Sequence, residues 1–107
     1  MILIIGGANS GKGDYAKTLG FPESEIAFNI HELVFQNPDF APGLLESFLK
    51  NSVVTCDEVG SGVIPANRHE RAAREATGRL CVLLAQKAER VVRMVAGIPI
   101  TIKNCKL

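Results

Sequence analysis

The sequence predicts an α/β fold with a mostly parallel sheet, in a single domain that spans residues 1–107. Three observations favour this class. A continuous apolar run at residues 2–6 leads directly into a glycine-rich turn, as expected for a strand that is covered on both faces. Further strand-like segments then alternate with segments whose apolar residues recur at helical spacing. The last two strand-like segments, joined by the short turn "AG", predict a C-terminal β-hairpin.

In the first half of the chain we expect two strands and three helical segments. The glycine-rich turn feeds a short helix that stops at Gly20, and "FPESE" follows as a turn. Ile26, Phe28 and Ile30 alternate as in a second strand, and "HELVFQN" fits one or two helical turns. The next helix begins near Pro42 and places four apolar side chains on one face: Leu44, Leu45, Phe48 and Leu49.

The second half begins with a strand in "NSVVTCDEVG", where acidic residues arrive at the carboxyl end. Residues 66 to 89 form the longest expected helix, supported by oppositely charged residues four apart, such as Glu70 and Arg74. Its apolar residues recur at spacings of three and four: Ala73, Ala76, Leu80, Leu83 and Leu84. The segments "VVRMV" and "IPITIK" then form the closing hairpin.

Composition and charge exclude several classes of protein. Apolar residues make up 47% and charged residues 21%, which is typical of a globular domain. The net charge of +1 argues against nucleic acid as a partner. No apolar run approaches the roughly 20 residues that span a bilayer, so we expect no membrane span. The opening "MILII" has neither a basic flank nor a cleavage site, so we expect no signal peptide.

The cysteines and histidines do not form a zinc-site pattern. Cys56, Cys81 and Cys105 make no C-x-x-C pair, and His31 and His69 are isolated from them. Free thiols are typical of a reducing compartment, and we therefore expect a cytoplasmic protein.

The glycine-rich turn "GGANSGKG" follows the nucleotide-phosphate loop G-x-x-x-x-G-K-[ST] up to its last position. Such a turn, between a buried strand and a helix, directs successive backbone N–H groups at one point, where a phosphate binds. Lys12 can reach the outer phosphates as a mobile cation, and we expect it to act in catalysis. The expected nucleotide-binding residues are Gly6, Gly7, Ala8, Asn9, Ser10, Gly11, Lys12 and Gly13.

Gly13 stands where the pattern has the hydroxyl that binds Mg²⁺. Asp57 and Glu58 arrive at the end of a strand, where an acid that holds Mg²⁺ is expected, and Asp57 is the candidate that binds it through water. Ser10 and Asp14 lie close to Gly13 in sequence and are candidates to replace the missing hydroxyl in part. We therefore expect weak magnesium binding and reduced catalysis rather than loss of nucleotide binding.

Two segments of the second half resemble the adenosylcobinamide kinase/adenosylcobinamide-phosphate guanylyltransferase family. "DEVGSGVIPANRHERAAREATGRL" is similar to the family segment "NEVGxGIVPxNxxxRxFRDxxGRxNQ", and "AERVVRMVAGIPITIK" is similar to the family's closing strands. The opening "GGANSGKG" resembles the family's loop "GGARSGKS". The resemblance covers residues 1–14 and 53–103.

This resemblance implies a P-loop NTPase (RecA-like) fold, a three-layer sandwich, and a role in cobalamin (cobamide) biosynthesis. Family enzymes transfer a phosphoryl group from ATP or GTP to adenosylcobinamide, then transfer GMP to that phosphate through a guanylylated histidine. By position, Glu58 would lie in the catalytic cleft as a metal partner or polarising acid. Arg71, Arg74 and Arg79 would either contribute to a site or form a solvated helix face. The resemblance also implies a homo-oligomer.

The chain departs from the family pattern in its middle. The family's histidine-rich segment is missing, and His31 is the one histidine before "DEVG", which makes it the candidate for guanylylation. His31 is followed by Glu32 and not by a basic residue, so we expect no covalent guanylyl group; the simpler alternative is a capping or packed surface histidine. Two hypotheses remain: a cobinamide kinase-like phosphotransferase, or a catalytically impaired nucleotide-binding relative with a partner or regulatory role.

Overall fold

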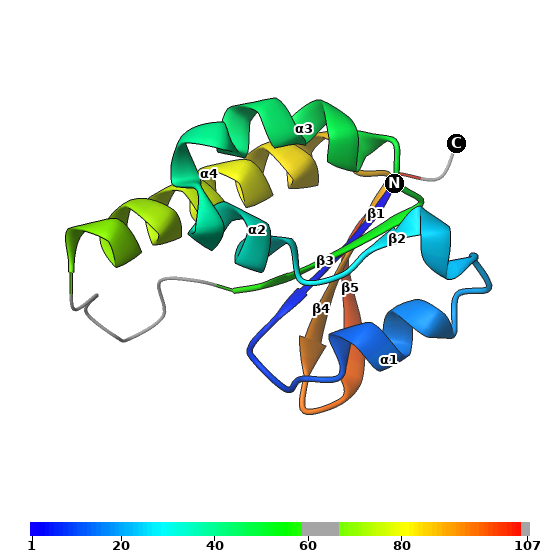
Figure 1. Cartoon of the computed structure of the whole chain (residues 1–107). Coiled ribbons are helices and arrows are strands. Elements are labelled where there is room, and N and C mark those ends of the chain that lie inside the picture. The colour runs from blue at the N-terminus through cyan, green and yellow to red at the C-terminus, as the bar shows by residue number, and fades with distance from the viewer. Residues whose placement is uncertain (59–66, 106–107) are drawn as a thin grey trace.

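The structure, a computed structural model, describes residues 1–58 and 67–105 of the chain. A five-stranded sheet lies between helices (Figure 1). Within these ranges the helices are α1 (Lys12–Lys17), α2 (Ile30–Gln36), α3 (Ala41–Leu49) and α4 (Arg68–Lys87), and the strands are β1 (Ile2–Gly6), β2 (Ile26–Ala27), β3 (Val53–Asp57), β4 (Arg90–Val95) and β5 (Ile98–Asn104). Gly60, Gly62, Val63 and Pro65, which carry part of the family resemblance, lie outside the described residues.

The sheet has the strand order β2-β3-β1-β4-β5. Strand β1 occupies the centre and pairs in parallel with β3 and β4, and only β5 runs antiparallel. The register aligns Gly6 with Asp57 on one side and with Met94 on the other. The carboxyl ends of the three central strands therefore meet at one edge of the sheet. The predicted α/β class with a mostly parallel sheet and a closing hairpin is confirmed.

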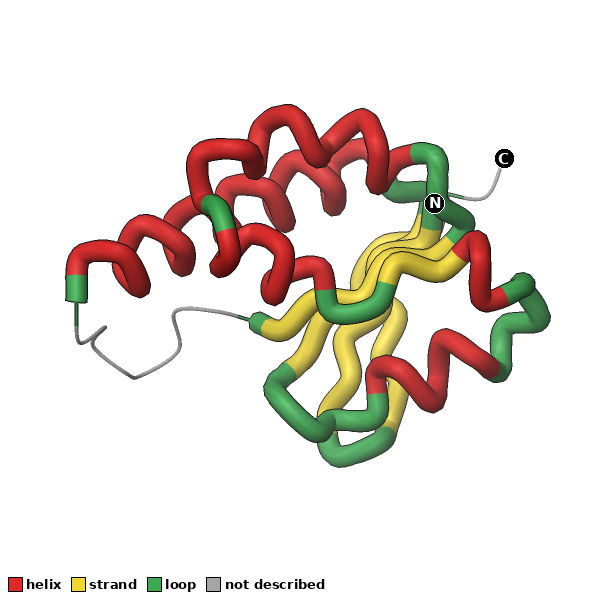
Figure 2. The backbone as a smooth tube through the Cα atoms, viewed as in Figure 1, coloured by secondary structure: helices red, strands yellow, loops and turns green. Residues whose placement is uncertain are grey.

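Helices cover the two faces of the sheet unequally (Figures 1 and 2). On one face, α2, α3 and α4 pack against the sheet through Val34, Phe48 and Leu80. On the other face, the short α1 packs through Ala16 against Ile4 and neighbouring strand residues. The molecule therefore has three layers with a core on each side of the sheet. The burial on both faces explains why β1 and β3 are continuous apolar runs.

The expected second strand is shorter than its apolar alternation indicated. Strand β2 ends at Ala27, and the chain then turns at Asn29, whose φ is 53°. The backbone N–H of Asn29 donates to Thr55 Oγ1 at 2.8 Å, and Ile30 begins α2. Ile26 and Ile30 are both buried, but in the cores on opposite sides of the sheet. The chain passes from one core to the other between Ile26 and Ile30. Its apolar residues therefore alternate as they would in a strand.

The structure also tests the expected apolar face of α4 and the expected hairpin turn. The predicted face of α4 is buried except at Leu83, whose side chain is 39% exposed. The "AG" turn is tight as expected: Ala96 and Gly97 have φ values of 49° and 79°. Two successive positive φ values match the right-handed twist of a two-residue hairpin.

None of the helices in residues 1–58 and 67–105 is long and apolar enough to cross a membrane. At the free edge of the sheet, β5 exposes Ile98, Ile100 and Ile102. Exposed edge strands are pairing sites for another chain, so this edge is the place to look for the expected homo-oligomer, which stays a prediction.

Candidate functional site

The candidate site lies at the carboxyl edge of the parallel strands, where ligands of open α/β sheets bind. The loop at residues 7–11 follows β1, and Asp57 ends the neighbouring strand β3. Between them is a cavity of about 500 Å³, within the range of small-molecule sites. Its lining residues are Ala8, Asn9, Ser10, Gly11, Lys12, Gly13, Asp14, Asn29, His31, Glu32 and Asp57. Of the expected nucleotide-binding residues, only Gly6 and Gly7 are not among them.

The backbone of the loop is fixed by the hairpin as well as by its own turns. Asn9 and Gly11 have positive φ values of 60° and 90°, and the N–H of Ser10 donates to the carbonyl of Gly7 at 3.3 Å. From β4–β5, the N–H of Gly97 donates to the carbonyl of Ser10 at 3.1 Å. Sequence patterns alone do not indicate this contact, because Ser10 and Gly97 are far apart in the chain.

Gly6 is required where the loop leaves β1. A Cβ atom there would lie 2.8 Å from the carbonyl oxygen of Met94 on β4 and 2.6 Å from Ser10 Oγ. Contacts this short would push either the loop or β4 away. The loop therefore keeps its position only because the side chain at residue 6 is absent.

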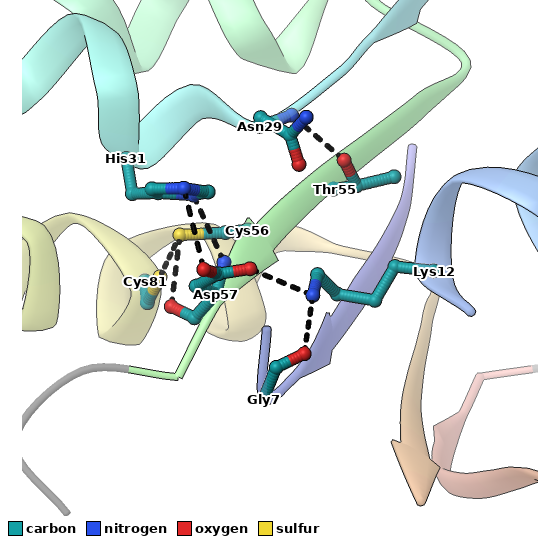
Figure 3. Close-up of polar contacts among 8 residues, drawn as sticks. All are labelled: Gly7, Lys12, Asn29, His31, Thr55, Cys56, Asp57 and Cys81. Carbon is teal, nitrogen blue, oxygen red and sulfur yellow. Dashed lines mark hydrogen bonds and ion pairs between the residues drawn. The ribbon is translucent and has the colours of Figure 1, made fainter. Parts of the chain in front are cut away.

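Lys12 holds a positive charge inside the cavity (Figure 3). Its side chain is only 5% exposed, and Nζ donates to the Gly7 carbonyl at 2.6 Å and lies 2.7 Å from Asp57 Oδ1. A buried charge costs free energy unless it is paired and hydrogen-bonded, and both conditions are met here. The structure therefore brings together Lys12 and Asp57, which are 45 residues apart in the chain.

His31 contacts Asp57 through both ring nitrogens (Figure 3). Nδ1 accepts a hydrogen bond from the Asp57 backbone N–H at 3.1 Å, and Nε2 lies 3.4 Å from Asp57 Oδ2. Because Nδ1 accepts, the proton of the neutral ring is on Nε2, where it faces the carboxylate. One carboxylate oxygen thus faces Lys12 and the other faces His31, which fixes the orientation of the Asp57 side chain.

The sequence did not reveal the contact between His31 and Asp57. The available signal was weak: a histidine in the first turn of α2, directly after a strand that pairs with β3. His31 does line the cavity, and the expectation that it carries no guanylyl group stays a prediction. His69 has a different place, since its Nε2 donates to the Phe35 carbonyl at 2.9 Å and joins α4 to α2.

Glu58 lies apart from the ion pair of Lys12 and Asp57 and contacts a different residue. Its carboxylate pairs with Arg93 through two contacts, Nε to Oε1 at 2.7 Å and Nη2 to Oε2 at 3.2 Å. It lines a second cavity, of about 250 Å³, together with Ile5, Asp57, Gly78 and Cys81. The expected catalytic role of Glu58 stays a prediction, and the structure places it beside the second cavity.

Arg74 and Arg79 form ion pairs along α4. Arg74 lies 3.5 Å from Glu70, and Arg79 lies 3.9 Å from Glu75, both at the i,i+4 spacing that the sequence indicated. The Arg79 side chain is 70% exposed, as expected for a solvated helix face.

The residues that line the cavity around Gly13 supply few ligands for a metal ion. Asp57 is the acid nearest to Lys12, and the buried Ser10 Oγ has no hydrogen-bond partner among the described residues. Mg²⁺ is commonly held by one or two carboxylates together with substrate phosphates and waters. Within residues 1–58 and 67–105, no group of three or more His, Cys, Asp and Glu side chains is placed to hold a metal ion. Asp57 and Ser10 would fit Mg²⁺ only as minor ligands, and nucleotide phosphates would have to supply the rest.

These features define an α/β protein with a polar cavity at the carboxyl edge of a parallel sheet, containing a buried lysine and an oriented carboxylate. The family model described as cobinamide kinase / cobinamide phosphate guanyltransferase matches residues 36–102. The match covers more than half of the chain, and the chain belongs to this family. It includes Asp57 and Glu58 but begins after the loop at residues 6–13. No curated protein matches the chain. Family membership supports a role in cobalamin biosynthesis.

Proposed function

We propose that the protein binds ATP or GTP at residues 6–13 and transfers its terminal phosphoryl group to adenosylcobinamide. The observation that carries this proposal is the ammonium group of Lys12, buried in a 500 Å³ cavity and 2.7 Å from Asp57. The family match supports the acceptor, because the family's description names cobinamide as the molecule that is phosphorylated.

Each group of the cavity has a task in this proposal. The backbone N–H groups of the loop bind phosphate oxygens, and Lys12 leaves Asp57 to neutralise the charge that develops on the transferred group. Helix α1 has six residues, so its dipole adds little, and Lys12 supplies most of the positive charge. His31 keeps Asp57 in place when Lys12 turns to the phosphates.

Magnesium and the acceptor would bind next to these groups. Mg²⁺, when bound with the nucleotide, supplies further neutralisation of phosphate charge, and Asp57 and Ser10 are the residues that would hold it. Glu58 acts in catalysis only if the acceptor extends into the second cavity, where its carboxylate faces Arg93.

Gly13 favours a second candidate function, that of a nucleotide-binding relative with impaired catalysis. No hydroxyl is present at this position to hold Mg²⁺ next to the phosphates. Such a protein would bind the nucleotide and act through a partner. The two candidates agree on nucleotide binding and differ in phosphoryl transfer.

One experiment separates the two candidates. Purified protein is incubated with Mg²⁺, ATP or GTP, and adenosylcobinamide, and the corrinoid product is analysed by mass spectrometry. A product heavier by one phosphate, formed by the wild type and by Lys17→Ala but not by Lys12→Ala, supports the kinase. Lys17 is a matched control because it lies on the same helix with an exposed side chain. Nucleotide binding without product supports the second candidate, and absence of binding contradicts both.

A further inference from the structure

The thiols of Cys56 and Cys81 lie next to each other on the α4 side of the sheet (Figure 3). Their sulfur atoms are 3.3 Å apart, although the residues come from β3 and α4 and are 25 positions apart. A disulfide has an S–S length of about 2.05 Å, so the sulfurs would have to approach each other by about 1.3 Å to reach bonding distance. Neither thiol is used in the proposed phosphoryl transfer.

The two cysteines differ in access. Cys56, a residue of β3, is completely buried on the α4 side of the sheet, whereas Cys81 is partly exposed and lines the 250 Å³ cavity. A small oxidant that enters this cavity therefore meets Cys81 first. Cys105, the third cysteine, is exposed directly after β5, beside Glu89, which directly precedes β4, and serves as an internal comparison.

The two cysteines also differ in acidity. The pKa of Cys81 is lowered, because the Cys56 thiol can donate a hydrogen bond to the Cys81 thiolate. The same hydrogen bond raises the pKa of Cys56, and burial and the nearby charge of Asp57 raise it further. The accessible sulfur, that of Cys81, is thus the one that ionises first. In this arrangement an exposed thiolate reacts with an oxidant, and a neighbouring thiol then forms a disulfide with it.

We propose that Cys56 and Cys81 form a reversible disulfide when the protein meets a hydroperoxide. The Cys81 thiolate attacks one peroxide oxygen, the O–O bond breaks, and Cys81 becomes a sulfenic acid while hydroxide (or alkoxide) leaves. The sulfur of Cys56 then attacks the sulfenic sulfur, the S–O bond breaks, and the proton of Cys56 leaves with the hydroxyl group as water. Overall, two thiols are oxidised to one disulfide, and one peroxide is reduced.

The disulfide would join β3 to α4 one residue before Asp57 and draw the Cys81 side chain out of the second cavity. A thiol reductant would reverse it. This proposal rests on the positions of the two sulfurs and of the cavity, and it stands whether or not the protein binds a nucleotide.

The test uses the full chain with Cys105→Ser, which removes the exposed thiol without changing the core. The reduced protein is exposed to hydrogen peroxide, denatured, alkylated with N-ethylmaleimide and analysed by intact-mass spectrometry. We expect two alkyl groups before oxidation and none after it, a mass lower by two hydrogens, and full recovery of both thiols with dithiothreitol. Non-reducing digestion should yield one peptide pair that links Cys56 to Cys81.

Two further variants in the same background test the order of the steps. Cys56→Ser should leave a sulfenic acid at Cys81 that dimedone traps, whereas Cys81→Ser should leave Cys56 unreactive as long as the protein is folded. If both thiols of the Cys105→Ser protein remain open to alkylation after peroxide, or if the oxidised product is a covalent dimer, the proposal is overturned. That result does not depend on whether the two core variants fold.

Discussion

The two cavities beside Asp57 are lined by different kinds of chemical group. The larger one, on the loop side, is lined largely by a glycine-containing turn and holds Lys12 in contact with the Asp57 carboxylate. The smaller one, on the α4 side, is lined by Glu58, which pairs with Arg93, and by Cys81, which lies next to Cys56. The backbone groups and the cation of the larger cavity suit phosphate binding. The two thiols beside the smaller cavity suit the thiol oxidation proposed above.

The difference follows from the alternation of side chains at the end of β3. Successive residues of a strand point to opposite faces, so Cys56 packs on the α4 side while Asp57 faces the loop. Glu58 then returns to the α4 side and contacts Arg93. Asp57 therefore borders both cavities, whereas Glu58 lines only the smaller one, and of these two adjacent acids only Asp57 contacts Lys12.

The largest effect that we expect is on the loop cavity. Lys12→Ala should weaken ATP or GTP binding by at least about tenfold, a loss of about 1.4 kcal/mol, because it removes the buried cation. Titration calorimetry measures the affinity, and Lys17→Ala should bind like the wild type. Unchanged affinity in Lys12→Ala would show that the phosphates do not reach this cavity.

A comparison of the two acids tests the division between the cavities. Asp57→Asn should weaken magnesium-dependent nucleotide binding severalfold, because it removes the charge that Lys12 and Mg²⁺ share. Glu58→Gln should leave nucleotide affinity within about twofold, since its carboxylate is paired with Arg93, and should lower only the transfer to the acceptor. Calorimetry measures the nucleotide affinity, and analysis of the corrinoid product measures the transfer to the acceptor. Equal losses of nucleotide affinity in both variants would contradict the division.

A smaller gain is expected from restoring the missing hydroxyl. Gly13→Ser should strengthen magnesium-dependent nucleotide binding, and the structure has room for the change, since a Cβ there lies 3.9 Å from the Phe28 ring. Either a serine or an alanine also stabilises the first turn of α1, by roughly 0.5–1 kcal/mol for alanine. Gly13→Ala is therefore the matched control. Superimposable magnesium titrations of the serine and alanine variants would show that the hydroxyl is not what limits binding.

The smallest effect, none at all, is expected for covalent guanylylation. After incubation with GTP and Mg²⁺, intact-mass spectrometry should show no GMP adduct, because both ring nitrogens of His31 face Asp57 and the Lys12 ammonium is paired with the same carboxylate. A GMP-sized adduct that disappears in His31→Asn would instead make His31 the guanylyl carrier.

The sequence determined the elements whose signals are local. Strands β1 and β3 were evident as apolar runs, α4 from its periodicity, and the hairpin from its short turn, because burial on a given face leaves a regular spacing in the chain. The loop at residues 6–13 was evident because its glycines and lysine are close together in sequence. Family membership was also evident, because the family's motifs can be recognised in the sequence without knowledge of the fold.

Tertiary structure alone decided which of these residues meet. The contacts between Lys12 and Asp57, between His31 and Asp57, and between Cys56 and Cys81 join segments that are at least 25 residues apart. They exist because β1 and β3 are paired in a fixed register and because helices pack on both faces of the sheet. Periodicity shows that a residue is buried, but register and packing determine which neighbour it is buried against. For this reason the sequence identified the two acids at the end of β3, and only the fold showed that Asp57 contacts Lys12 and Glu58 contacts Arg93.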